Sequence, residues 1–484
     1  MTDRKFIKDD IGLTLQRKQR SKHWDKIAQR KEAEHGPSAY YHVRLAAIYQ
    51  SITLGHARVL EIGMGSGDLL AKLEPEFGVG VDISSGMVAK ARNRHSDLHF
   101  VQADGHHLPL SGKFDLIILS DLLNDVWDVQ AILAEVFRLS SPKTRVVVNF
   151  YSRLWQLPLN IAQALGLAKL LAEQNWLTKE DVSNLMVLTD FEVIRSFPEI
   201  LFPLNIPLLA PFLNRLLVKF PPFSWLALTG FIVARPAPIK TRHEEDITVS
   251  VVIPARNEAG NIERLIQKIP HMGSSTELIF IEGHSQDNTY EAIEQAIQAH
   301  PERNCQLIRQ AGKGKGDAVR LGVDMAKGDV LMILDSDLSV SPDDLPRFYS
   351  AVIEGRGELI NGVRLVYPME NFAMRPMNFL GNKFFSLAFS WIFGQPVKDT
   401  LCGTKVLSRA TYEKIKANRS YFGDFDPYGD FDLLFGAARL SLKITDMPVR
   451  YRSRTYGAPN ISRWRDGWLL LRMTLFAAAK IKFI

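Results

Sequence analysis

The sequence predicts an α/β protein made of two doubly wound domains that follow one another along the chain. Its 484 residues exceed what one hydrophobic core usually holds. Short apolar runs alternate with helical runs from Arg58 to Leu119, and the same alternation restarts at Val249 and continues to Leu334. Such alternation is typical of βαβ units around a parallel sheet. No aligned repeat relates the halves, which favours a fusion over a duplication.

The first domain is expected over residues 1–236. Basic residues such as Arg17, Lys18 and Arg20 precede its first strand, and a solvated helix face is the simplest interpretation. Its predicted elements are strand Arg58–Ile62, helix Asp68–Leu73, strand Gly78–Asp82, helix Ser85–Arg94, strand Leu98–Gln102, strand Phe114–Leu119 and a last strand at Leu226–Ala234. Residues 237–247, with the charged stretch Lys240–Asp246, are expected to form a linker.

The second domain is expected over residues 248–462, followed by a basic amphipathic helix at 463–484. Its predicted elements are strand Val249–Ile253, helix Ala259–Lys268, strand Glu277–Ile281, helix Tyr290–Ala299, strand Gln306–Ile308, helix Gly316–Lys327 and strand Val330–Leu334. Both domains therefore present strand ends at a carboxyl edge, where open α/β sheets bind ligands.

Composition narrows the class of protein. Two cysteines are too few for a disulfide framework, and the charged start, Met1–Asp10, has no apolar signal sequence. The longest charge-free runs, of about 15 residues, are shorter than a membrane-spanning helix requires. We therefore expect a cytoplasmic protein, with the inner face of the membrane as its alternative location. The net charge of +6 favours anionic partners, but the basic residues are dispersed, so nucleic acid is not expected.

The first candidate site begins with a glycine loop after the first strand. Glu61 lies on that strand, and Gly63, Gly65 and Gly67 follow it. Such a loop lets the backbone approach a ligand closely, and a dinucleotide site is the competing interpretation. The third glycine of a dinucleotide pattern would fall at Asp68, whose carboxylate repels a pyrophosphate at a helix N-terminus.

Acidic residues follow the other strands of this domain. Asp82 ends the second strand, where an acid can accept both ribose hydroxyls, and Asp104 follows the third, near the expected adenine edge. With Glu61 and Asp121, they make an edge that suits a ligand carrying sulfonium and ammonium groups. The electrostatics indicate S-adenosylmethionine.

The motifs Glu61–Gly67, Gly80–Ser84 and Phe114–Asp121 resemble those of class I methyltransferases, over about residues 40–236. The resemblance implies that Glu61 and the glycines hold the methionyl part, Asp82 the ribose and Asp104 the adenine. His106 and His107 are candidate bases for methyl transfer, although polar loop histidines are the more common interpretation.

The second candidate site lies in the loops of the second domain. Its residues for a nucleotide sugar are expected to be Pro254, Arg256, Asn257, Glu258, Glu282, Lys315 and Asp335. The segment Gly312–Ala318 resembles a phosphate-binding loop but lacks the Walker spacing, so no kinase or ATPase is predicted.

Asp335 and Asp337 end the strand that begins at Val330. Alternate residues of an extended strand point the same way, so both carboxylates can hold one Mg²⁺ or Mn²⁺ ion. A metal there would neutralise a leaving diphosphate. The alternative is a solvated acidic turn.

These motifs, with Asp399–Lys405 and Asp430–Leu434, resemble family 2 glycosyltransferases of the GT-A fold, particularly the dolichyl- and polyprenyl-phosphate sugar synthases, over residues 249–462. The implied architecture is two Rossmann-like domains, a class I methyltransferase fold followed by a GT-A nucleotide-sugar fold. The resemblance implies inversion at the anomeric carbon. The family commonly has paired aspartates where this chain has Glu282 and Gly283.

Several residues are candidates for the catalytic step. Asp399, Asp430 and Asp432 are expected to position the acceptor or act as a general base. Arg454, with Arg450 and Arg452, could bind a lipid phosphate, or the three arginines could lie on an exposed edge strand.

Aromatic and basic residues raise the question of membrane contact. Phe379–Phe393, the end of the chain from Trp464 and the proline-broken stretch Leu201–Phe220 each fit an interfacial helix or a helix packed on the core.

The leading hypothesis is a bifunctional transferase that glycosylates a lipid-linked or glycan acceptor and methylates a component of the same pathway. One alternative is a soluble glycosyltransferase for a small molecule or glycan precursor. Another makes the first domain a module that binds S-adenosylmethionine or a partner without catalysis.

Overall fold

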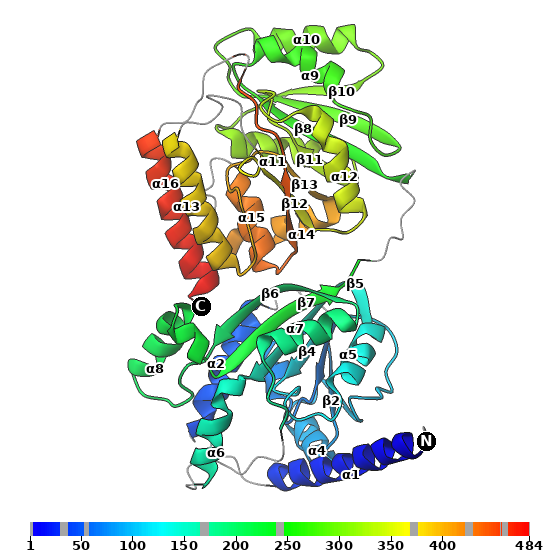
Figure 1. The fold of residues 1–484 in the computed structure, drawn as a ribbon. Coiled ribbons are helices and arrows are strands. Elements are labelled where there is room, and N and C mark those ends of the chain that lie inside the picture. Colours follow the sequence, from blue (N-terminus) through cyan, green and yellow to red (C-terminus); the bar gives the residue numbers. More distant parts are fainter. Residues whose placement is uncertain are drawn as a thin grey trace. The chain divides into compact units, whose positions relative to one another are not determined.

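The computed structural model describes residues 3–29, 37–52, 58–164, 174–238, 246–367, 376–421, 429–454, 456 and 463–483. The chain divides into two compact units, which we describe separately (Figure 1). Unit 1 comprises Met1–Ala237 with Phe483–Ile484, and unit 2 comprises Pro238–Lys482. Residues 239–245 of the expected linker lie outside the described residues.

Unit 1 is built on a seven-stranded sheet in the order β3-β2-β1-β4-β5-β7-β6. All neighbours pair in parallel except β7, which is antiparallel to both β5 and β6. The strands are β1 Arg58–Ile62, β2 Phe77–Asp82, β3 His99–Gln102, β4 Phe114–Ser120, β5 Ser140–Tyr151, β6 Phe191–Glu199 and β7 Thr229–Pro236.

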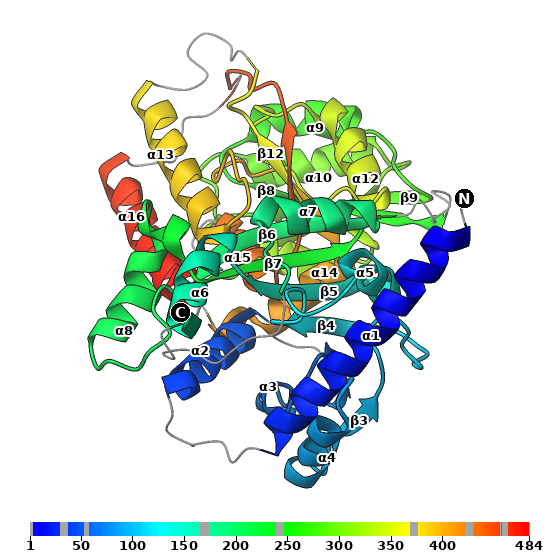
Figure 2. The ribbon, with the colours of Figure 1, turned by 60° about the horizontal axis from the view of Figure 1, so that its bottom comes forward.

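Helices lie on both faces of this sheet. They are α1 Asp3–Ala28, α2 Pro37–Ile52, α3 Asp68–Lys72, α4 Ser85–Arg94, α5 Val129–Arg138, η1 Arg153–Trp155, α6 Gln156–Ala164, α7 Lys179–Leu188, α8 Leu209–Pro211, η2 Phe212–Leu216, η3 Leu217–Lys219 and η4 Phe223–Leu226. Helix α1 runs alongside α4 (Figure 2). Side chains of β4 alternate between two cores: Ile117 and Leu119 pack on one face, and Leu116 and Ile118 on the other.

Unit 2 contains a second seven-stranded sheet, in the order β10-β9-β8-β11-β13-β12-β14. Strand β13 runs antiparallel to its neighbours β11 and β12, whereas β12 and β14 are parallel. The strands are β8 Thr248–Ala255, β9 Ser275–Glu282, β10 Asn304–Arg309, β11 Val330–Ile333, β12 Leu359–Val363, β13 Lys405–Ser408 and β14 Ile444–Pro448.

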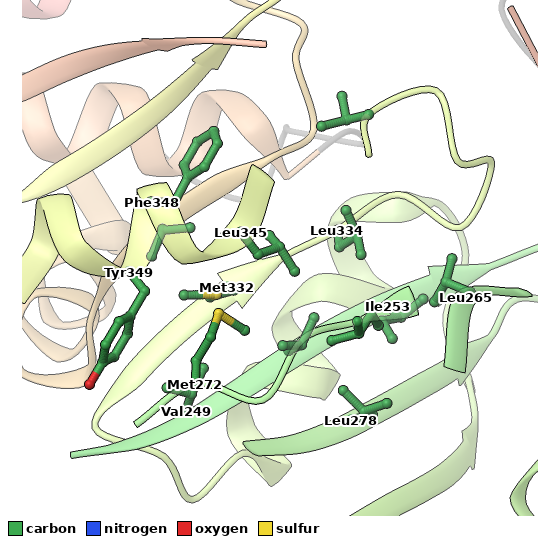
Figure 3. Packing of buried hydrophobic residues seen from close by; sticks show 14 of the residues in the cluster. Val249, Ile253, Leu265, Met272, Leu278, Met332, Leu334, Leu345, Phe348 and Tyr349 are labelled. Carbon is green, nitrogen blue, oxygen red and sulfur yellow. The ribbon is translucent and has the colours of Figure 1, made fainter. Parts of the chain in front are cut away.

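The helices of unit 2 cover this sheet and extend beyond it. They are η6 Ala259–Asn261, α9 Ile262–Lys268, α10 Thr289–Ala299, α11 Lys315–Met325, η7 Pro342–Asp344, α12 Leu345–Ile353, α13 Pro376–Phe393, α14 Arg409–Ala417, η8 Arg419–Tyr421, α15 Asp430–Arg439, α16 Arg463–Ala477 and η9 Ala478–Lys482. In the core, Val249 and Ile253 of β8 and Met332 of β11 pack against Leu265 of α9 and Phe348 of α12 (Figure 3).

The predicted fold class is confirmed, because each unit is a mixed α/β sheet whose first strands are parallel. Helices α13 and α16 lie side by side in unit 2 (Figure 1). Among the residues that the structure describes, no helix combines the length and the apolarity that crossing a bilayer requires.

Candidate active sites in the two units

The glycine loop of unit 1 turns sharply between β1 and α3. Gly63, Gly65 and Gly67 all have positive φ, at 76°, 56° and 75°. Side chains rarely adopt this conformation, so the loop depends on glycine. A Cβ atom at Gly67 would also press on the ring of Phe100. The sequence therefore folds into a loop whose backbone lies open to a ligand.

Glu61 lies at the base of this loop with its side chain buried. Burial raises the pKa of its carboxyl group to about 8, although a hydrogen bond from the Leu70 amide opposes the rise. The Oε2 atom is buried and has no hydrogen-bond partner. A buried, unpartnered carboxylate oxygen fits a ligand that brings an ammonium group, such as the methionyl part of S-adenosylmethionine.

Asp82 connects the loops after β1 and β2. Its two oxygens accept hydrogen bonds from the backbone amides of Gly65 and Ser84, each at 2.9 Å. Burial raises its pKa to about 6 despite these bonds. Carboxylate oxygens can each accept a second hydrogen bond, so Asp82 remains able to bind ribose hydroxyls.

Asp121 follows β4 in the left-handed backbone region, with φ at 54°. It accepts hydrogen bonds from the Tyr41 hydroxyl at 2.8 and 2.9 Å and from the Asn149 amide. Tyr49 donates to the Asn149 oxygen at 2.7 Å, which fixes the amide. Burial raises the pKa of Asp121 to about 6. The end of β4 thus carries a half-buried carboxyl group held by α2.

Helix α1 contacts the loops that follow β2, β3 and β4, and the sequence did not reveal these contacts. Arg17 pairs with Asp104, and Arg20 pairs with Asp125. Trp24 donates to Asp125 at 2.8 Å. Asp25 accepts from Ser84 Oγ at 2.5 Å and from the Gly86 amide at 2.9 Å. Treating these basic residues only as a solvated helix face was therefore wrong for Arg17 and Arg20.

Of the two histidines proposed as bases, His106 is bound on both ring nitrogens. Its Nδ1 lies 2.6 Å from Asp104 Oδ1, and its Nε2 accepts from the Asp128 amide at 3.2 Å. Burial opposes ionisation of Asp104, but the hydrogen bonds from His106 outweigh it and hold the Asp104 pKa below its ordinary value. His106 therefore fits a role in orienting Asp104 better than a role as a base. His107 is exposed.

The loops after β8 and β9, which were predicted to bind a nucleotide sugar, are joined by hydrogen bonds. The Asn257 amide donates to Ser285 Oγ at 3.0 Å, and the Gln286 amide donates to Asn257 Oδ1 at 2.7 Å. Glu282 accepts from the Ser285 amide at 2.6 Å. Pro254 is joined to the segment Asp335–Asp337, because its carbonyl accepts a hydrogen bond from Ser336 Oγ at 2.9 Å. Arg256 is exposed beside these residues.

Asp335 forms an ion pair with Lys315, the first residue of α11, at 2.5 Å. Burial disfavours the charged form of Asp335, but the attraction of Lys315 outweighs it and lowers the pKa. Gly403 packs against this pair, and a Cβ atom there would collide with both side chains. A larger residue at this position would require both side chains of the pair to shift.

Asp337 forms a second ion pair, with Arg454 at 2.8 Å. Arg454 also approaches Glu258, at 3.9 Å. Burial raises the pKa of Glu258 to about 7, and the charges of Asp337 and Asp335 add to the rise. The structure therefore brings three predicted acids and two predicted cations into one cluster at the carboxyl edge.

These residues fit a divalent ion that is shared with a substrate. No group of three or more His, Cys, Asp or Glu side chains within the described ranges is arranged to hold a metal alone. Mg²⁺ usually binds one or two carboxylates together with substrate phosphates. Asp335 and Asp337 supply two carboxylates. Their ion pairs with Lys315 and Arg454 show that these carboxylates stabilise positive charge.

The remaining candidate acids of unit 2 are all paired. Asp399 is completely buried and accepts two hydrogen bonds from Arg364, at 2.8 and 2.9 Å, and one from Asn382 at 2.8 Å. Burial alone would raise its pKa, but Arg364 overrides this and lowers it to about 2. Asp399 therefore stays ionised and fixes Arg364.

Asp430 and Asp432 begin α15 but have different partners. Asp430 lies 3.3 Å from the ammonium of Lys405, which is fully buried. Asp432 pairs with Arg419 at 2.6 Å. Asp430 also acts electrostatically on Lys315, which places it near the ion pair of Lys315 and Asp335. Residues two apart project from nearly opposite sides of a helix, so only one of them faces that cluster.

The arginines before the chain end separate as well. Arg454 joins the cluster, whereas Arg450 lies over the ring of Tyr367 at 5.3 Å and Arg452 is exposed. Lys405 and Arg364 were not predicted as site residues. For Lys405, the signal in the sequence was a lysine in a β-strand after a glycine. For Arg364, the local sequence carried no signal.

Comparisons with known proteins match two separate parts of the chain. Residues 59–143 match the family model described as a methyltransferase domain, and residues 250–415 match that of glycosyl transferase family 2. Glycosyltransferase AglJ of Haloferax volcanii is 29% identical over 234 residues, which cover 48% of this chain and 72% of that protein. The dolichol-phosphate mannosyltransferase of Pyrococcus furiosus is 31% identical over 22% of this chain and 30% of its own length.

For seven relatives, which include the Pyrococcus furiosus mannosyltransferase, the chain covers only 30% to 54% of the relative's own length. A crystal structure of an S-adenosylmethionine-dependent methyltransferase from Thermotoga maritima aligns with 41% of this chain and 90% of its own, at 16% identity and a TM-score of 0.33. By the two family matches the chain is an enzyme of the transferase class, with one region similar to methyltransferase domains and a second similar to family 2 glycosyltransferases.

Proposed function

We propose that unit 2 transfers a sugar from a nucleotide-diphosphate sugar to a polyprenyl-phosphate or related lipid-linked or glycan acceptor, with inversion at the anomeric carbon. The cluster of Asp335, Asp337, Lys315 and Arg454 carries this proposal. The names of the relatives support the acceptor class, since they include dolichol-phosphate and undecaprenyl-phosphate sugar transferases.

Asp335 and Asp337 would hold the Mg²⁺ or Mn²⁺ ion. When bound, the ion supplies positive charge to the diphosphate that leaves. Lys315 and Arg454 are then available to the phosphate oxygens, because the carboxylates that they pair with have another cation to bind. Glu258 lies close enough to Arg454 to keep its guanidinium oriented.

The acceptor determines whether a base is needed. A lipid phosphate is already ionised and requires only cations and alignment. For a glycan hydroxyl, Asp430 is the candidate base of this chain, because it acts on Lys315 at the cluster. Asp399 has a positioning role through Arg364, since all its contacts are internal. Asp432 stabilises Arg419 instead.

The test is transfer by the purified full chain with a panel of UDP- and GDP-sugars, a polyprenyl phosphate and Mg²⁺ or Mn²⁺. Asp337→Ala should lower the rate roughly hundredfold or more, as removal of one group that stabilises developing charge usually does. Asp324→Ala is the matched control, because Asp324 pairs with Lys416 on the surface of the same unit. Equal activity of the parent and Asp337→Ala, or no dependence on metal, contradicts the proposal.

For unit 1 we propose methyl transfer from S-adenosylmethionine to a component of the same pathway. Glu61 and the glycines Gly63, Gly65 and Gly67 would bind the methionyl part, Asp82 the ribose and Asp104 the adenine, with Asp121 at the acceptor side. The bound cofactor supplies an electrophilic methyl group. The residues of the chain align donor and acceptor, which is the main requirement of such a displacement.

A binding module without catalysis is the second candidate for unit 1. It is favoured by one observation: both ring nitrogens of His106 are engaged, so His106 does not serve as the base. Calorimetry with S-adenosylmethionine, followed by a search for methylated products in a cell extract, separates the two. Tight binding without product supports the module.

We also propose that unit 2 touches a membrane surface. Helix α13 exposes Leu380, Phe384 and Leu387 at helical spacing, and the neighbouring α16 exposes Trp468 and Leu475. Apolar faces of this kind fit a helix pair that lies in the interface. Flotation with liposomes should weaken when residues beyond Ser462 are removed.

A further inference from the structure

The connection between β6 and β7 buries two polar side chains and exposes several large apolar ones. We call residues 200–228 of unit 1 the apolar cap; it contains α8, η2, η3 and η4. Asn214 and Lys219 of the cap are buried. Soluble units normally show the reverse arrangement.

Polar contacts anchor the buried side of the cap. Asn214 accepts hydrogen bonds from the amides of Leu201 and Phe202 at 2.8 Å each and donates to the Tyr40 hydroxyl of α2 at 3.2 Å. Lys219 and Arg44 both pair with the buried Glu199 at the end of β6. The cap is therefore fixed to the unit by the hydrogen bonds of Asn214 and the ion pair of Lys219.

The outer face is strongly apolar. Leu208 is 88% exposed and Trp225 is 68% exposed, although both side chains bury well in ordinary proteins. Their exposed neighbours in the cap include Phe212, Leu216, Phe223 and Leu226. An exposed apolar surface of this size marks a binding surface.

Charge and chain geometry identify the partner as a lipid bilayer. The stretch contains no acidic residue, and its exposed charge is Arg215, which suits anionic headgroups. Tryptophan and phenylalanine are typical of the membrane interface. Pro207, Pro211 and Pro221 keep the helical turns short, so the cap can lie on a bilayer but not cross it.

The cap lies at the same edge of the unit 1 sheet as the glycine loop and the residues Asp82 and Asp121. Thr229, which begins β7, is paired with Tyr151 at the end of β5 and with Glu199 at the end of β6. The carboxyl ends of β4, β5 and β6 therefore share this edge with Asp121. Trp155 of η1 donates to the Leu226 carbonyl at 2.9 Å and ties the next loop to the cap. In both views α8 projects beyond the sheet of unit 1 (Figures 1 and 2).

We propose that the apolar cap docks unit 1 onto the surface of an anionic lipid bilayer, with the cofactor edge facing the lipid. This inference goes beyond the proposed reactions, and it implies that an acceptor carried by the membrane reaches unit 1 without leaving the bilayer.

The test is vesicle flotation of the full chain with phosphatidylglycerol and phosphatidylethanolamine. To remove the contribution of unit 2, every protein carries Leu380→Glu, Leu387→Glu and Trp468→Glu. In this background, Leu208→Glu with Trp225→Glu should weaken vesicle binding at least tenfold, since burial of one large apolar side chain changes an equilibrium constant roughly ten- to hundredfold.

The matched control is Val187→Glu with Leu188→Glu, since these α7 side chains are also exposed, at 62% and 57%, but lie outside the cap. Retained flotation of the control, with loss in the cap variant, supports the docking surface. Calorimetry with S-adenosylhomocysteine, compared across the variants, checks that unit 1 is folded.

Unchanged flotation of the cap variant overturns the inference and indicates that another part of the chain or a second copy covers the cap. Absence of flotation before the cap is changed overturns it as well. Failure of methyl transfer with flotation intact would refute the proposed reaction of unit 1 while leaving the docking surface in place.

Discussion

Replacing Glu61 with glutamine removes one buried charge and keeps the shape of the side chain. The pKa of Glu61 rises from an ordinary value of 4.5 to about 8 in the folded unit. A folded-state pKa above the unfolded value means that the unfolded chain loses its proton more readily. Glu61 therefore contributes stability below about pH 4.5, and this contribution is lost as the pH rises to about 8.

The size of the effect follows from the same two values. Each tenfold change in proton affinity corresponds to about 1.4 kcal/mol, so ionisation of Glu61 lowers the free energy of unfolding by about 3 kcal/mol more at pH 8.5 than at pH 5.5. Glutamine cannot ionise. Between pH 5.5 and pH 8.5, the free energy of unfolding of Glu61→Gln should therefore rise by about 3 kcal/mol relative to that of the parent. Any pH-independent cost of burying the amide leaves this difference unchanged.

The assay is hydrogen exchange of the β1 and β4 amides at both pH values, because these buried strands report the opening of unit 1 alone. Glu76→Gln is the control, since Glu76 is an exposed acid of the same unit. If the parent and Glu61→Gln lose stability equally between pH 5.5 and 8.5, burial does not control the protonation of Glu61.

Three further outcomes follow from the same contacts. Affinity of the parent for S-adenosylmethionine, measured by calorimetry, should strengthen roughly tenfold from pH 6 to pH 7, because the ionised fraction of Glu61 rises while the ammonium of the ligand stays protonated, and Glu61→Gln should remove this dependence. Asp399→Asn should lower the free energy of unfolding of unit 2 by about 2 kcal/mol at pH 7, because the folded pKa of about 2 makes the ionised form stabilising; in denaturant titrations the difference should shrink as the pH falls from about 4 to 2. Asp430→Asn should cost about 3 kcal/mol by leaving the buried ammonium of Lys405 without its carboxylate, and adding Lys405→Met should recover part of that loss; equal stability of the two variants would contradict this account.

The fold could be predicted where strands pair in parallel and are buried on both faces. β1 and β2 are short apolar runs that lead into a glycine or an acidic residue, and β8 is a short apolar run that ends in Pro254-Ala255, so their sequences identify them. No strand is predicted at β5, because it opens with Ser140-Ser141-Pro142-Lys143-Thr144 rather than with apolar residues. β13 escapes prediction for a similar reason, since its four residues include the fully buried Lys405.

The sequence predicted which loops form the candidate sites. It did not predict which residues from distant parts of the chain contact those loops. Positions after parallel strands meet at one edge by topology, which brings Asp335 and Asp337 near Lys315 without any knowledge of side-chain contacts. Arg364 and Asn382 reach Asp399 from other elements of the fold. Contacts of that kind depend on how the helices pack, and the local sequence carries no signal for them.

Helix α1 holds three loops of the cofactor edge at once. Arg17, Trp24 and Asp25 contact Asp104, Asp125 and the start of α4, over about two turns of the helix. A rigid rod fastened at several points moves as one body, so the loops cannot loosen one at a time. Under the methyl transfer proposed for unit 1, exchange of a spent methyl donor for a fresh one would require α1 and the three loops to open together, and this opening would limit turnover.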